Sequence, residues 1–575
     1  MHGGTQSASA KLLSYIALAT ALGTAALLPV LFFPFIPNIF DAAKYTIVIF
    51  IALLLLVVFA IFSALQRTIE VSRSFWTIGF GVLALSTIVS ILVSSPNKYE
   101  ALTGSGIFFV ALSLLFIILA TAIRQRFTSA LVFALGASGV LITIFSVLEK
   151  VGVNMFSVFG LNGTAIAGLF PNGGSLVNVS LLLVTFVALV LHSVTQKVLV
   201  TKAVSISLSG VVLLGLIVNG VTMLPGNPQA PVLLPFSASW SIALDVLKTP
   251  RTALIGVGPQ GYAQAFTLFK PLALNNTPYW AVRFGSAHNV PLDMVVTHGI
   301  VGVSALVLIV LGIFARIRST RKEDLPLLGA VITSVLLFLV MPVGPVLWVV
   351  FTLLLVAWQA AQSAQQVGED VSPSTFVIVS AHSKTGKDEK HVATGIVSGI
   401  ALVFIVIALA GLYFNGRSLV SQVIYAQSLE AVRANKAKEA YDLMREAINV
   451  APYHEDMRRA FSQINLSIAQ GLTQKKDLND EEKKTAVTLI QQSINEAKAA
   501  VALNQTDASN WAALAVVYDN LIGAAKEADQ WTVAAYTQAI IRDPANPRLR
   551  VDLGGVFRKL KSNEQASRLF EQGAQ

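Results

Sequence analysis

Long apolar stretches constrain this chain more than any other feature of its sequence. They recur along the first 414 residues, and each reaches the roughly 20 residues that a helix needs to cross about 30 Å of hydrocarbon. Hydrophobic residues make up 54% of the 575 residues and charged residues only 13%, with a mean hydropathy of +0.69. This composition excludes a single water-soluble core. We therefore expect an all-α, polytopic membrane protein.

Eleven apolar windows predict spanning helices. They lie near residues 12–33, 45–65, 75–94, 106–123, 128–148, 175–195, 200–221, 298–315, 326–343, 346–362 and 393–414. The first window is too long for the apolar core of a signal peptide, and no clear small-residue cleavage site follows it. We expect it to be retained as a helix.

Basic residues predict the orientation of these helices. They fall on alternate loops, at Arg67, Arg73, Arg124, Arg126, Lys197, Lys202, Arg316, Arg318, Arg321, Lys322, Lys384, Lys387 and Lys390. The positive-inside rule places these loops and the N-terminus in the cytoplasm, and an odd number of spans places everything after Phe414 outside. We expect a multi-pass protein of a bacterial inner membrane that also contacts membrane lipids.

One long external loop, residues 222–297, departs from this charge bias. It alone among the external loops carries a group of basic residues, namely Lys248, Arg251, Lys270 and Arg283. Basic residues on the outer side need a reason other than topology. The loop is therefore the first place to look for a site.

Composition divides the chain into four parts. Residues 1–362 form the predicted membrane domain, and residues 363–392, rich in Ser, Gln, Lys and Gly, are expected to be a flexible cytoplasmic linker. Residues 393–414 are the last predicted span. Residues 415–575 show amphipathic helical spacing in units of roughly 30–40 residues, which predicts an extracytoplasmic helical-repeat tail.

The tail resembles tetratricopeptide repeats. Trp511, Leu514 and Tyr518 follow one helix face, and the small residues Ala535 and Ala539 follow on the next helix. Such α-solenoids stack neighbouring helices around a continuous core and present a concave face to a partner. A protein partner for the tail and a simple packing or dimerisation module are both compatible with this pattern.

Charge and cysteine content exclude several classes of function. Residues 1–414 hold 21 Lys and Arg against 12 Asp and Glu, whereas residues 415–575 hold 20 against 19. The excess of positive charge thus belongs to the membrane part, with +9 there and +1 in the rest, and nucleic acid is not an expected partner. Cysteine is absent from the sequence, which excludes thiolate nucleophiles and zinc–cysteine sites. No cluster has metal-ligand spacing, so we expect neither a metal nor a cofactor.

The large loop ends in a run that matches a known pattern. His288 and Asn289 are followed by nine residues and then by Gly299 and Gly302. Three further features stand upstream: Trp240 with Ala243 and Leu244, the turn Gly256-Val257-Gly258-Pro259, and Phe170 with Asn172 in LFPNGG. Over about residues 10–362 the chain resembles the O-antigen ligase superfamily. The resemblance implies a GT-C-like, inverting, metal-independent glycosyltransferase that uses a polyprenyl-diphosphate-linked glycan.

The implied reaction moves a glycan from the diphosphate to an acceptor hydroxyl. It needs a base near the hydroxyl and cations near the leaving diphosphate. His288 is the candidate base, because imidazole has an unperturbed pKa of about 6.5. Arg283 is the candidate diphosphate clamp, because its planar fork binds phosphate oxygens bidentately. The other expected substrate-binding residues are Arg251, Lys248, Asn289 and Asn172.

Several alternatives remain open at this stage. The family's Arg before the Trp is missing, since residues 235–239 read Pro-Phe-Ser-Ala-Ser. Ligation to a lipid glycan, polymerisation of repeat units and transfer to a protein hydroxyl all use similar parts. The chain could instead be a non-catalytic membrane anchor for a repeat scaffold. A transporter is disfavoured, because the predicted spans contain almost no ionisable residues.

Overall fold

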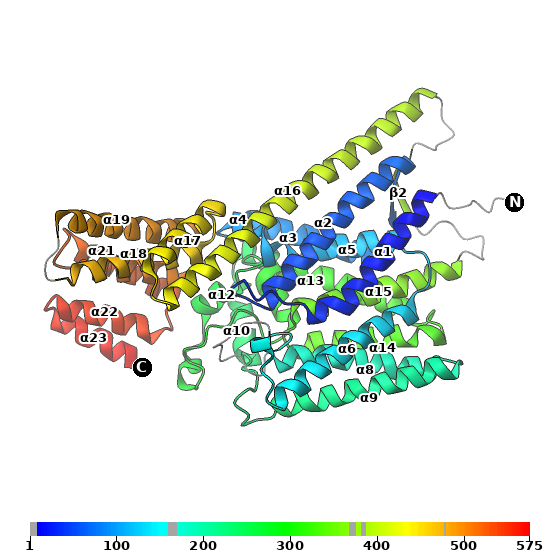
Figure 1. Cartoon of the computed structure of the whole chain (residues 1–575), viewed down its shortest axis with the longest axis horizontal. Helices are drawn as coiled ribbons and strands as arrows, with labels where there is room; N and C mark the ends of the chain where they lie inside the picture. The colour runs from blue at the N-terminus through cyan, green and yellow to red at the C-terminus, as the bar shows by residue number, and fades with distance from the viewer. Residues whose placement is uncertain (1–7, 159–169, 367–374, 381–386, 476–478, 575) are drawn as a thin grey trace.

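The computed structural model describes residues 8–158, 170–366, 375–380, 387–475 and 479–574. Apart from one two-stranded sheet, the regular structure is helical, as the sequence predicts. Figure 1 shows a bundle of long apolar helices at one end and a domain of shorter helices at the other, joined by one long helix. We call these parts the bundle and the tail.

Eleven helices of the described residues are long and apolar enough to cross a membrane, and each expected window overlaps one of them. They are α1 (Ala8–Leu27), α2 (Asp41–Gln66), α3 (Phe75–Ser94), α5 (Phe108–Ala122), α6 (Thr128–Lys150), α8 (Ser175–Thr195), α9 (Leu199–Thr222), α13 (Val290–Ile317), α14 (Leu325–Val340), α15 (Pro345–Gln366) and α16 (Lys387–Arg433). Short helical turns between them are η1 (Leu28–Val30), α4 (Lys98–Ala101), η2 (Gly104–Ile107), α7 (Met155–Val158) and η4 (Lys322–Asp324).

Helix α15 forms the centre of the bundle. In its apolar window 89% of the residues are buried, against 17% in the window of α16, which packs along α2 on the outside. Trp358 of α15 lies against Trp76 of α3, with ring centroids 5.2 Å apart. The indole nitrogen of Trp76 donates to the Ile309 carbonyl of α13 at 3.2 Å. The apolar sequence thus builds a packed helical core and also leaves many large apolar side chains exposed on the outside of the bundle.

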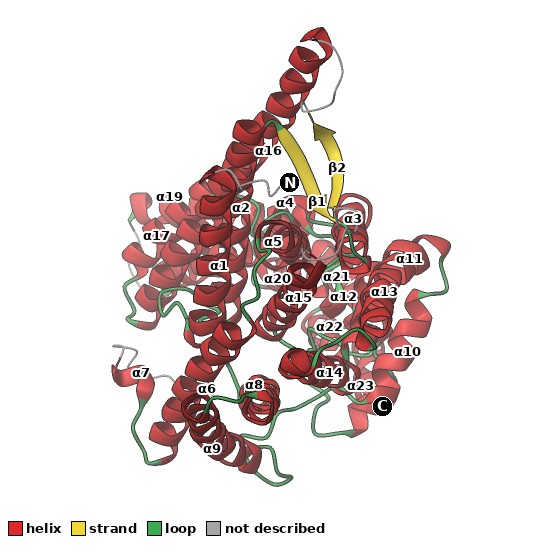
Figure 2. Ribbon diagram, turned by 90° about the vertical axis from the view of Figure 1, so that its right-hand side faces the viewer, coloured by secondary structure: helices red, strands yellow, loops and turns green. Residues whose placement is uncertain are grey.

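The two strands are a departure from the all-α prediction. Strand β1 (Thr68–Ser72) pairs antiparallel with β2 (Thr375–Ser380), whose residues were expected to belong to a flexible linker (Figure 2). Strand β1 alternates in polarity over only five residues, and β2 is a run of four apolar residues between Thr375 and Ser380; both are too short to stand out from a loop in the sequence. The rest of the expected linker includes residues 367–374 and 381–386, which lie outside the described residues.

Helix α13 begins earlier than the expected span. The Asn289 side chain accepts from the Leu292 amide at 3.1 Å and caps the helix, and Pro291 occupies its first turn. The helix then bends at Gly299, whose φ of 65° interrupts the helical geometry. The expected start near His298 therefore coincides with this bend, because the apolar window records only the part beyond it.

Helix α16 runs without interruption from Lys387 to Arg433 over 47 residues. The expected boundary between the last span and the tail, at residues 414 and 415, falls inside this helix. The apolar run ends there, but the helical backbone continues.

The tail consists of consecutive packed helix pairs. Helix α16 packs on α17 (Ala437–Val450), and the following pairs are α18 (Glu455–Thr473) with α19 (Asp480–Leu503), α20 (Ala508–Asp519) with α21 (Ala528–Arg542), and α22 (Pro547–Lys559) with α23 (Asn563–Ala574). Leu514, Tyr518 and Ala535 are buried in its core, and Ala539 is fully buried where α20 and α21 pack. Small residues at these positions let the paired helices approach closely.

The large loop between α9 and α13 folds into a small unit of its own. It contains α10 (Phe236–Val246), α11 (Pro250–Ile255), α12 (Tyr262–Phe269) and η3 (Leu272–Asn276). Ile242, Tyr262 and Phe266 form its core together with Val296 of α13. The loop is therefore anchored on the first half of α13, at the end of the bundle that carries the tail (Figure 1).

Candidate functional site

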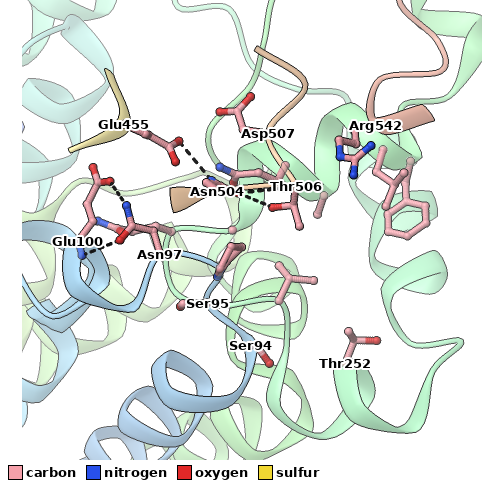
Figure 3. A pocket seen from close by; sticks show the side chains of 18 of the residues that line it. Ser94, Ser95, Asn97, Glu100, Thr252, Glu455, Asn504, Thr506, Asp507 and Arg542 are labelled. Carbon is pink, nitrogen blue, oxygen red and sulfur yellow. Dashed lines mark hydrogen bonds between the residues drawn. The ribbon is translucent and has the colours of Figure 1, made fainter. Parts of the chain in front are cut away.

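A cavity lies where the bundle, the large loop and the tail meet. It has a volume of about 1070 Å³. Its polar and charged lining comes from three parts of the chain: Ser94, Ser95, Asn97, Glu100 and Ser105 of the bundle, Thr249, Arg251, Thr252, Gln260, Gln264 and Arg283 of the large loop, and Glu455, Asp456, Arg459, Asn504, Thr506, Asp507 and Arg542 of the tail. Figure 3 shows tail side chains such as Glu455 and Asp507 on one side and Ser94, Ser95 and Asn97 on the other.

Two glycine-containing motifs contact each other next to this cavity, which Val257 lines. The turn at Gly256 packs on the bend of α13, and the Val257 amide donates to the Val296 carbonyl at 2.9 Å. A Cβ on Gly256 would lie 2.3 Å from the backbone of Thr297, and one on Gly299 would lie 2.5 Å from the backbone of Leu254. Both positions also have positive φ, so only glycine fits. The spacing recognised in the sequence thus reflects a backbone contact.

Arg251 lies on the short helix α11, which ends at Ile255, directly before the Gly256 contact. Thr249 caps α11 by accepting from the Thr252 amide at 3.4 Å, and Pro250 occupies the first turn. The Arg251 guanidinium donates to the Val93 carbonyl at the end of α3. This bond holds the cation at the edge of the bundle, where it lines the cavity.

Arg283 connects the large loop to the tail. Its Nη1 and Nη2 donate to the two carboxylate oxygens of Asp507 at 3.2 Å each, and Nη1 also donates to Ser509 Oγ at 2.8 Å. Asp507 is 3% exposed and caps α20 by accepting from the Ser509 amide. Burial alone would raise the pKa of Asp507, but Arg283, the Ser509 amide and Arg459 together lower it. The predicted diphosphate clamp is therefore engaged by a carboxylate of this chain.

The four cavity arginines divide into two classes. Arg283 and Arg459 both lie near Asp507, at 3.2 and 3.7 Å. Within the described ranges, no ion pair joins Arg251 or Arg542 to a carboxylate; Arg542 instead lies over the Trp511 ring, 4.9 Å from its centroid, and donates to Gln538 Oε1 at 2.6 Å. Arg251 and Arg542 thus leave positive charge available to an anion, and they face the cavity from opposite parts of the chain.

Glu455 is a buried acidic residue of the lining, and one of its two carboxylate oxygens has no hydrogen-bond partner among the described residues. The residue is 8% exposed, and its Oε1 accepts from Asn504 Nδ2 at 3.2 Å. Its Oε2 is buried and has no hydrogen-bond partner among the described residues. Burial, and then the nearby carboxylates of Glu100 and Asp507, raise the pKa of Glu455 to about 8.

His288 lies outside this cavity lining. Its ring Nδ1 is 2.9 Å from the Leu234 carbonyl, its amide donates to Ser239 Oγ at 2.9 Å, and Phe236 meets its ring edge-on at 5.8 Å between centroids. A carbonyl can only accept, so the proton of the neutral ring is on Nδ1 and the lone pair is on Nε2. We call this group of Leu234, Phe236, Ser239 and His288 the His288 shelf.

The other predicted site residues also fall away from the cavity. Asn289 caps α13, and its amide nitrogen donates to the Leu339 carbonyl at 2.9 Å. Lys248 is exposed and pairs with Asp245. Asn172 is buried and donates to Asn178 Oδ1 at 2.9 Å, before the start of α8. Of the six residues predicted, the structure brings Arg251 and Arg283 together in one cavity.

Sequence reasoning did not single out Glu455, Arg459 or Arg542. They lie in the tail, between 158 and 320 residues along the chain from the residues of the large loop. One signal was available: residues 454–459, His-Glu-Asp-Met-Arg-Arg, form a charge-dense run in an otherwise Ala-rich repeat region.

Comparison with known proteins assigns no function to this cavity. No protein-family model and no curated protein matches the chain. Among solved structures, the human IFIT1 dimer with m7Gppp-AAAA is similar at 13% identity, covering 67% of this chain and 94% of that chain, with a TM-score of 0.18. A monomeric mutant of IFIT1 with Gppp-AAAA gives the same values. So low a TM-score establishes no shared fold, and neither neighbour bears on function.

Proposed function

We propose that the chain is a membrane glycosyltransferase that moves a glycan from a polyprenyl-diphosphate donor to an acceptor hydroxyl. The cavity at the tail-bearing end of the bundle is the site of transfer, on the extracytoplasmic face. The observation that carries the proposal is the position of Arg251, a cation without a carboxylate partner among the described residues, at the edge of the spanning helices. A lipid-linked anion arrives at this level of the membrane.

The requirements of the reaction agree with this position. Negative charge grows on the diphosphate as its bond to the sugar breaks, and a fixed cation in a partly enclosed site stabilises that charge. The guanidinium of Arg251 is held by the Val93 carbonyl and retains further donors for phosphate oxygens. The cavity volume of about 1070 Å³ accommodates a diphosphate and adjoining sugars.

The resemblance to the O-antigen ligase superfamily, from which the expected donor comes, also agrees with this position. Its glycine positions, Gly256 and Gly299, are the ones whose contact sets α11 and Arg251 in place. Arg251 takes over the role of the Arg that the family carries before Trp240 and that this chain lacks. His288 is assigned no proton transfer in this proposal, because it does not line the cavity.

The test compares the full-length wild type with Arg251→Gln and Lys248→Gln in liposomes. The donor is a polyprenyl-diphosphate-linked disaccharide ending in N-acetylglucosamine, offered with a lipid glycan, a second donor molecule or a Ser-containing peptide. Release of polyprenyl diphosphate and transferred glycan are both measured. We expect kcat/KM to fall about 100-fold in Arg251→Gln and to stay unchanged in the exposed Lys248→Gln control. Equal rates for wild type and Arg251→Gln would contradict the assignment, and no wild-type transfer to any acceptor would favour a non-catalytic anchor.

A further inference from the structure

Glu455 occupies a position in the tail that packing alone does not explain. It begins α18 at the junction with the bundle, where Asn97 Nδ2 donates to the Tyr453 carbonyl at 2.7 Å and His454 Nδ1 lies 3.5 Å from Glu100 Oε1. Docking is thus carried by the residues just before Glu455. The Glu455 carboxyl itself turns to the cavity (Figure 3).

Its two oxygens have different surroundings. Oε1 accepts from Asn504 and lies 3.9 Å from Arg459 Nη1. Oε2 is buried without a hydrogen-bond partner in the described parts of the chain. A buried polar atom without a partner is costly, by about 1–3 kcal/mol, and such atoms at a cavity wall point to a group that binds there.

The walls of the cavity that the bundle and the large loop form hold other polar atoms of this kind. Ser94 Oγ, Ser95 Oγ and Gln264 Oε1 are buried, line the cavity and lack hydrogen-bond partners among the described residues. Hydroxyl and amide groups in this arrangement suit a hydroxyl-rich ligand such as a sugar. Within the described ranges, no three His, Asp or Glu side chains are grouped to hold a metal ion, so the acidic residues here are not assigned to a cation.

We propose that the tail completes the active site, with Glu455 as the base that takes the proton from the acceptor hydroxyl. This inference rests on the proposed glycosyl transfer. It makes the tail part of the catalytic machinery, with the donor diphosphate at Arg251 of the large loop and the acceptor at the tail wall.

The step balances without a further reactant. The acceptor O–H bond breaks and its proton goes to the Glu455 carboxylate. The acceptor oxygen forms a bond to the anomeric carbon, and the bond from that carbon to the phosphate oxygen breaks. The diphosphate leaves with the electron pair, and Arg251 stabilises its charge. Glu455 later returns the proton to water.

The surroundings of Glu455 set the pH at which it can act. The charged and titratable groups that face it are Glu100 of α4, Asp507 before α20, and His454, Asp456 and Arg459 beside it on the chain. Because the pKa of Glu455 is raised to about 8, the carboxylate needed as a base forms as pH rises through that value. The rate should increase with pH up to about 8 and then level off.

The test uses the full chain in liposomes with the donor and acceptors described above. Glu455→Gln keeps the size of the side chain and removes the base, Glu455→Asp keeps the carboxyl but shortens it, and Glu446→Gln is a matched control at an exposed position of α17. We expect kcat to fall about 100-fold or more in Glu455→Gln with KM little changed, and the rise toward pH 8 to vanish. Glu455→Asp should retain the rise with a lower kcat.

The outcomes separate this inference from the proposed function. If the wild type and Glu455→Gln share the same kcat and pH profile while Arg251→Gln is impaired, the transfer stands and the role of Glu455 is wrong. If the wild type transfers nothing, both fall. If Glu455→Gln does not fold, as judged by thermal unfolding, Glu455→Asp decides: a rate and profile identical to the wild type would overturn the assignment.

Discussion

The His288 shelf and the cavity are both built on the large loop, but they use different kinds of residues. The shelf consists of neighbours within the loop, and its contacts to the Leu234 carbonyl, Ser239 and Phe236 fix the backbone before α13. The cavity collects charged residues from three distant parts of the chain. The motif thus supplies a framework, whereas the charges that can act on a substrate come from elsewhere.

This difference explains why the short motif from His288 to Gly302 did not predict the cavity residues that come from the tail. Gly256, Gly299 and Asn289 hold the loop against α13, and their spacing is visible in the sequence because they lie close together along it. Arg251, Glu455 and Arg542 line one cavity only when the tail is docked on the bundle and the large loop. The following predictions test whether substitutions in the framework and in the cavity have different effects on stability, tail docking and glycan transfer.

The largest effect should follow from breaking the framework. Gly256→Ala places a Cβ 2.3 Å from the Thr297 backbone at a positive φ. We expect a loss of more than about 3 kcal/mol in stability and loss of the cavity, measured by thermal unfolding in detergent. Gly285→Ala is the control, since a Cβ there meets nothing within 4 Å. Equal stability of the two variants would show that the Gly256 contact is dispensable.

Tail docking should weaken as pH rises. The pKa of Glu455 is raised from 4.5 to about 8 in the folded chain, so its contribution to docking is fully present below about 4.5 and is lost as pH rises through 8. The change over this range is on the order of 5 kcal/mol. Hydrogen exchange of the α18 amides, corrected for intrinsic rates, should show increasing opening from pH 5 to 9. Glu455→Gln should remove this dependence; a persistent dependence would assign it to another group.

Removing the buried partner of Arg283 should loosen the same junction. Asp507→Asn leaves Arg283 and Arg459 facing each other without their shared carboxylate. We expect docking to weaken by about 2 kcal/mol, because breaking a buried pair strands its charges and Arg283 is partly solvated. Asp442→Asn breaks an exposed pair with Arg445 and should cost about 0.5 kcal/mol or less. Both are measured by hydrogen exchange of α20.

The smallest effect should come from the shelf. His288→Gln removes the ring from the Leu234 carbonyl and from Phe236, which should cost about 1 kcal/mol in thermal stability. Glycan transfer should stay within about twofold of the wild type, because the ring does not line the cavity. A loss as large as that of Arg251→Gln would place His288 in the chemistry and end the distinction between shelf and cavity.

The sequence predicted the helical bundle well because spanning length and hydropathy are local properties. It missed β1 and β2, whose pairing joins residues about 300 positions apart. It also ended the last span where the apolar residues stop, near Phe414, although α16 continues to Arg433. Arg283 lines the cavity, but it is paired with Asp507, a partner that no local pattern in the sequence connects with it.

The continuous helix α16 has a consequence for how the tail can vary. At 1.5 Å per residue its 47 residues form a rod of about 70 Å, and its last turns pack directly on α17. Because successive residues are turned by about 100° around a helix axis, adding one residue after Phe414 would turn the tail away from the bundle. The tail therefore has one rotational phase in which Glu455 and Arg251 line the same cavity, and a change in the length of this segment alters both the rotation and the axial position of the tail.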